Sequence, residues 1–95
     1  MLRMERKKIQ NRETLIQLVK RAIELLCEKN ISSIVVLSSY KINSVIQENF
    51  GINIKVDKIG RILSRVAKLN ELKRLSTNIP KYKLHISKVS SLKFF

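Results

Sequence analysis

Four cations recur at three- and four-residue spacing between positions 58 and 68, which places them on one face of an α-helix. They are Lys58, Arg61, Arg65 and Lys68. A guanidinium group binds phosphate or the edge of a guanine bidentately, whereas an ammonium group binds phosphate as a point charge. This face therefore offers recognition of a polyanion.

Groups suited to catalysis or metal binding are scarce. The chain has 7 acidic residues and one histidine, with no nucleophile–base signature, phosphate-cradling glycine loop or metal-ligand cluster. His85 has no Cys, Asp or second His near it in the sequence, so we expect an ordinary strand residue. Cys27 borders an apolar stripe, so we expect a buried or half-buried hydrophobe. The sequence predicts neither an enzyme nor a cofactor.

The net charge of +13 is unevenly distributed along the 95 residues. Residues 1–12 carry +4, residues 13–50 carry no net charge, and residues 51–95 carry +9. Such a surplus destabilises a compact chain through self-repulsion, which a polyanionic partner relieves. We therefore expect one surface to bind nucleic acid. An anionic membrane is the weaker alternative, because the cationic segments are not paired with an exposed apolar face.

Several absences bear on location. One cysteine cannot form an internal disulfide, and no apolar run of signal-peptide type follows the basic N-terminus. No stretch approaches the roughly 20 apolar residues that a membrane span needs. We expect a cytoplasmic, nucleoid-associated protein.

The spacing of apolar residues predicts three helices, at residues 11–29, 40–50 and 56–69. We expect Asn11 to cap the first, Ser38-Ser39 to cap the second, and Gly51 to end the second in a left-handed conformation. Gly60 is expected on a flank of the third helix, where it would permit close approach of another backbone. One apolar arc of the third helix lies opposite the cations and comprises Val56, Ile59, Ile62, Leu63 and Val66.

Three short segments are expected to be strands, at residues 34–37, 72–76 and 82–86. The last two predict a β-hairpin, so the fold class is mainly α with a small β-hairpin (α+β). We divide the chain into a basic arm or helix extension at residues 1–10, one domain at residues 11–86 and a tail at residues 87–95. The rim of the hairpin is basic and comprises Lys73, Arg74, Lys81 and Lys83.

Residues 39–46, 50–52 and 58–63 look like a helix-turn-helix, and the hairpin looks like a wing. Over residues 11–86 the chain resembles the winged helix-turn-helix domains common among small archaeal and bacterial DNA-binding proteins. The connection before the third helix is slightly longer than usual. The resemblance implies that the third helix lies in a major groove, about 12 Å wide, while the second braces against the DNA backbone.

The candidate contacts divide into two classes. Arg61 and Arg65 are the main candidates for base contact, with Ser64 and Lys58 after them. Candidates for phosphate contact lie around them and are Ser39, Tyr40, Lys41, Lys55, Lys68, Lys73, Arg74, Lys81 and Lys83.

Two functions are open on this evidence. The first is a small transcription regulator that reads duplex DNA, often as a homodimer. The second is a non-catalytic accessory subunit of a replication or transcription complex, which binds DNA backbone and a protein partner. RNA association has no positive signal, because aromatic residues make up only 5% of the chain.

The C-terminal Leu92, Phe94 and Phe95 are expected to fold back onto the core, to pack in a dimer or to contact a protein partner. They faintly resemble peptides that dock on DNA sliding clamps. In this chain, however, Leu92 lies one position too close to the aromatic pair, and no Gln begins the motif.

Overall fold

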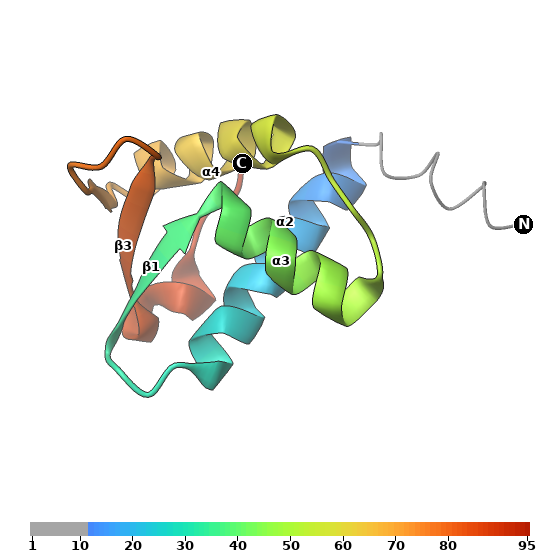
Figure 1. The fold of residues 1–95 in the computed structure, drawn as a ribbon. Coiled ribbons are helices and arrows are strands. Elements are labelled where there is room, and N and C mark those ends of the chain that lie inside the picture. The colour runs from blue at the N-terminus through green and yellow to red at the C-terminus, as the bar shows by residue number, and fades with distance from the viewer. Residues whose placement is uncertain (1–11) are drawn as a thin grey trace, which may run out of the picture.

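The computed structural model describes residues 12–95 as a mainly α-helical domain with a small three-stranded antiparallel sheet (Figure 1). The predicted class, mainly α with a small β part, is confirmed at this level. The predicted basic arm at residues 1–10 and the cap at Asn11 lie outside the described residues. In chain order the elements are α2 (Arg12–Lys29), β1 (Ile34–Ser38), α3 (Ser39–Phe50), α4 (Val56–Leu69), β2 (Lys73–Arg74), β3 (Lys81–His85) and the 3-10 helix η1 (Ile86–Ser91).

The sheet differs from the predicted two-stranded hairpin, because β1 joins it. The strand order is β1-β3-β2, so β3 is the central strand. β1 pairs with β3 over five residues, from Ile34 opposite His85 to Ser38 opposite Lys81. β2 is only two residues long, shorter than the predicted strand at residues 72–76. The sheet lies at one side of the three helices (Figure 1).

The core forms where the apolar faces of the helices meet one face of the sheet. Of the apolar arc predicted for α4, only Val56 is half-buried and the other four residues are buried. The apolar face of α2 is buried from Leu15 to Cys27, whereas Phe50, at the end of α3, is 40% exposed. From β3, Tyr82 and Leu84 enter the core. The largest fully buried side chains come from all three helices and two strands and are Val19, Ile23, Leu37, Ile42, Ile46, Ile59, Leu63, Val66 and Leu84.

Both predicted ends of α3 are confirmed. The hydroxyl oxygen of Ser38 accepts a hydrogen bond from the backbone N–H of Lys41 at 3.2 Å, as an N-cap does. Gly51 follows the helix with φ +66°, and its N–H donates to the carbonyl of Gln47. Glycine adopts this left-handed conformation without steric cost. Local sequence thus fixes the length of α3.

Asn43 ties the connection between α3 and α4 back onto α3. Its side-chain oxygen accepts a hydrogen bond from the backbone N–H of Ile54 at 3.3 Å. Its side-chain nitrogen also donates to the side-chain oxygen of Asn53 at 3.5 Å. Ile54 is buried beneath this contact. A connection of five residues is therefore held in place, and the start of α4 with it.

The C-terminal segment folds back onto the domain, one of the three arrangements considered for it. The side chain of Asn70, at the end of α4, donates to the carbonyl of Lys93 at 2.8 Å and accepts from its N–H at 2.9 Å. Phe94 is buried, and the ammonium of Lys20 lies 6.0 Å from its ring centroid. Phe95 remains 71% exposed. Of the last residues, Phe94 therefore joins the core and Phe95 does not.

Candidate nucleic-acid interface

Helix α4 has one buried face and one cationic face. Ile59, Leu63 and Val66 are among the residues that fix it to the core. The exposed residues of this helix include every candidate assigned to it from the sequence, namely Lys58, Arg61, Ser64, Arg65 and Lys68. Ridges of apolar residues on one side and cations on the other are what a helix needs to lie between a protein core and a polyanion.

No ion pair neutralises these cations within residues 12–95. The ion pairs there join Arg21 of α2 to Glu24 and Glu28, at 3.1 and 3.7 Å. Asp57 lies in the first turn of α4, where the helix dipole favours a negative charge. The exposed face beyond that turn is therefore uniformly positive, and bringing phosphates to it would reduce repulsion among its side chains.

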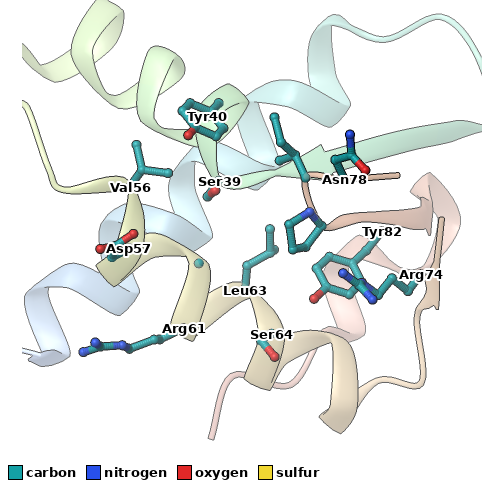
Figure 2. A pocket seen from close by; sticks show the side chains of 13 residues that line it. Ser39, Tyr40, Val56, Asp57, Arg61, Leu63, Ser64, Arg74, Asn78 and Tyr82 are labelled. Carbon is teal, nitrogen blue, oxygen red and sulfur yellow. The ribbon is translucent and has the colours of Figure 1, made fainter. Parts of the chain in front are cut away.

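A groove of about 820 Å³ lies beside this face (Figure 2). It is bounded by the start of α3, by α4 and by the loop that joins β2 to β3. Arg61 and Arg74 lie at opposite sides of it, and the guanidinium of Arg61 points away from its centre (Figure 2). Tyr40 and Ser64 also line it. The groove thus joins residues from three elements that are distant in sequence.

The loop at residues 76–80 is held in a compact shape by its own hydrogen bonds. The N–H of Leu75 donates to the carbonyl of Lys81 at 2.8 Å, which closes the loop. Inside it, the hydroxyl of Thr77 donates to the carbonyl of Ile79. Asn78, Ile79 and Pro80 therefore reach the groove wall. The sequence predicted a β-hairpin here but did not indicate that its loop faces α4.

The predicted phosphate contacts do not all come together. Ser39, Tyr40 and Arg74 line the groove beside α4, although Ser39 is itself largely buried. By contrast, Lys73 and Lys83 line a second hollow, together with His85 and Lys88. The remaining candidates lie apart from both hollows: Lys41 is exposed on α3, Lys55 precedes α4, Lys68 is on α4, and Lys81 is half-buried at the start of β3.

Other reactive groups gather into no site. Burial, with a smaller effect from the nearby Glu24 carboxylate, raises the pKa of the Cys27 thiol. Its burial confirms the prediction of a hydrophobe. In the described part of the chain, no three His, Cys, Asp or Glu residues are close enough together to hold a metal ion. No helix in residues 12–95 is long and apolar enough to cross a membrane.

Asn43 and Asn70 are the structural residues that sequence reasoning missed. Each bonds to backbone far along the chain, Asn43 eleven residues away and Asn70 twenty-three. Asparagine is common at exposed helix positions and ends, so its type gave no signal of these contacts. Comparison of the chain with protein-family models, curated proteins and solved structures gave no match.

Proposed function

We propose that this chain is a winged helix-turn-helix DNA-binding protein and acts as a small transcription regulator. In this proposal α3 and α4 form the helix-turn-helix, α4 enters the major groove, and β2, β3 and their loop form the wing. The observation that carries it is the exposed face of α4, where four cations lie without an ion-pair partner in the described residues. An α-helix fits a major groove about 12 Å wide.

The placement of α4 supports this role. Its apolar face is buried against the core, and the Asn43 contact fixes the connection that precedes it. A recognition helix must be held rigidly, because a bidentate contact with a base edge tolerates little displacement. Arg61 and Arg65 are the main residues proposed to contact bases. Ser64 and Lys58, on the same exposed face, are the next candidates for base contact.

The groove beside α4 supports a role for the wing. Arg74 reaches this groove from β2, while Tyr40 and Ser39 reach it from the start of α3. Phosphates on the strand that borders the major groove would meet these residues. Lys41 follows Tyr40 directly on α3, and Lys55 directly precedes α4. These contacts position the duplex and carry no sequence information.

The experiment that tests the regulator proposal is a selection of preferred duplexes from a random pool, followed by fluorescence-anisotropy titration. We expect a recovered motif that binds at least about tenfold more tightly than scrambled duplex, since specific sites exceed non-specific ones by larger factors in most regulators. Binding that never varies with sequence would contradict the regulator role. Absence of any duplex binding would contradict DNA binding itself.

The second candidate function is a non-catalytic accessory subunit that binds DNA backbone and a protein partner. Two fully or mainly exposed apolar side chains favour it, Ile31 before β1 and Phe95 at the end of the described chain. Because Phe94 is buried and Lys93 is bonded to Asn70, only Phe95 of the aromatic pair is available to a partner. Uniform affinity for all duplexes, together with a stable protein partner, would favour this function.

A further inference from the structure

The sheet has an outer face, turned away from the core, that the proposed contact with α4 does not use. On β3, Tyr82 and Leu84 are buried, and side chains alternate along a strand. Lys81, Lys83 and His85 therefore face outward. On the neighbouring strand β2, Lys73 is the direct partner of Lys83. We call Lys73, Lys81, Lys83, His85 and the adjacent Lys88 the outer basic face.

Like charges face each other on this surface. Lys73 and Lys83 are directly opposite across an antiparallel pair, an arrangement that destabilises a sheet. Lys88 of η1 lines the same hollow, of about 360 Å³. Glu71 also lines it, but no ion pair forms there among residues 12–95. Within the described part of the chain, no ion pair therefore offsets the repulsion, and an anion placed over the hollow would reduce it.

The outer basic face is separate from the groove beside α4. The two hollows share no lining residue. The two neighbouring residues of β2 illustrate this separation. Arg74 lines the groove beside α4, whereas Lys73 lines the hollow on the outer face. Arg74 is the cross-strand partner of the buried Tyr82. A duplex seated on α4 thus engages one side of the hairpin and leaves the other side's cations unused.

The spacing of the outward residues fits a nucleic-acid backbone. Alternate residues on an antiparallel strand are about 6.8 Å apart, which is close to the separation of successive phosphates along one DNA strand. Lys81, Lys83 and His85 form such a row of nitrogen donors, and Lys73 and Lys88 widen it. Lysine ammonium groups act as point charges for phosphate, so contact here would be independent of sequence.

From these observations we infer that the outer basic face is a second DNA-backbone site, so that one molecule bridges two duplex segments. The inference rests on the proposed binding of the first duplex by α4. It assigns the two halves of the basic rim to different DNA segments, with Arg74 on the first and Lys73 and Lys83 on the second.

A bridging assay tests this. One duplex is fixed to beads, and capture of a second, labelled duplex from solution is measured at increasing protein concentration. The variant Lys73→Gln/Lys83→Gln/Lys88→Gln should capture about tenfold less labelled duplex, while its affinity for a single short duplex falls about threefold or less. The matched variant Lys73→Arg/Lys83→Arg/Lys88→Arg keeps the charges and should capture as the parent does.

The outcomes separate this inference from the proposed function. Unchanged capture by the glutamine variant would overturn the second site, and would place bridging in a dimer that uses two copies of α4. A parent protein that binds a single duplex but captures no labelled second duplex would also overturn the second site. An acidic protein would then be the favoured partner of the outer basic face. If the glutamine variant and Arg61→Ala/Arg65→Ala lost single-duplex affinity equally, both sets of cations would bind the same duplex. The outer basic face would then not be a second site. A parent that binds no duplex would contradict the proposed function and the inference together.

Discussion

The side-chain oxygen of Asn43 in α3 accepts a hydrogen bond from the backbone N–H of Ile54, eleven residues later, at 3.3 Å. The acceptor is half-buried and the donor belongs to a buried residue. No helix or strand supplies another partner for this N–H, because it lies in the connection between α3 and α4. The Asn43 side chain thus holds the backbone two residues before α4 begins.

Asn43→Ala should lower the free energy of unfolding by about 1–3 kcal/mol, because it leaves a buried N–H without an acceptor. Urea denaturation measures the change. Asn43→Asp retains an acceptor oxygen and should lose less. Ser44→Ala, at an exposed neighbouring position of the same helix, is the control for a side chain without this contact. Equal stability of Asn43→Ala and Ser44→Ala would show that the contact does not hold the connection.

Gly60 gives a prediction of the opposite sign. A Cβ atom built at this position meets Ser39 Cβ at 4.0 Å, an ordinary contact, so the close backbone approach expected from the sequence is not what the helix requires. Gly60→Ala should therefore stabilise the protein by about 0.5–1 kcal/mol, because alanine loses less backbone entropy in a helix. Thermal unfolding measures it, and a lower midpoint would contradict it.

Gly51 is the matched comparison for Gly60. Its φ of +66° is disfavoured for residues with a side chain, even though nothing lies within 4 Å of a Cβ built there. Gly51→Ala should therefore lower stability by about 1–2 kcal/mol through backbone strain alone. The two glycine variants are expected to move the unfolding midpoint in opposite directions.

The two C-terminal phenylalanines should differ sharply. Phe94 is 8% exposed and packs with the core, whereas Phe95 is 71% exposed. Phe94→Ala should cost about 3–5 kcal/mol, as truncation of a buried ring does, and Phe95→Ala should be nearly neutral. Urea denaturation of both variants compares them directly. Equal, small effects would mean that the C-terminal segment is not part of the core.

The Cys27 thiol should be unreactive in the native protein. Burial raises the pKa of the thiol, so at mildly alkaline pH its thiolate fraction should be lower than in the unfolded chain. Its alkylation rate should be lower as well, because the thiolate is the nucleophile. Because the pKa is higher in the native protein, the protonated thiol contributes fully to the free energy of unfolding at any pH below the pKa of the unfolded thiol. That contribution is lost as the pH rises through the pKa of the native thiol. Alkylation as fast in buffer as in urea would contradict a buried thiol.

The sequence predicted what local chemistry determines and missed what distant pairing determines. Ser38 and Gly51 end α3 as predicted, because caps depend on residues within one turn. The pairing of β1 with β3 was not predicted, since nothing in residues 34–38 specifies a partner some 45 positions away. The predicted cations of α4 share its exposed face because helical periodicity is regular.

The basic rim of the hairpin is a second feature whose arrangement could not be predicted from the sequence alone. The sequence grouped Lys73, Arg74, Lys81 and Lys83 as one set of phosphate contacts. Neighbouring residues on a strand point to opposite faces, and only the sheet with its helices shows which face meets α4. Arg74 reaches the groove beside α4, while Lys73 and Lys83 line the other hollow.

The central claim is that Arg61 and Arg65 read bases from the exposed face of α4. The measurement is the affinity of the parent, Arg61→Ala and Arg65→Ala for a selected duplex and for its scrambled counterpart, with Lys29→Ala as the control. Each arginine variant should lose about 1–3 kcal/mol on the selected duplex and much less on the scrambled one, and Lys29→Ala should lose nothing. Equal losses on both duplexes would contradict base reading and reassign the arginines to phosphate contact.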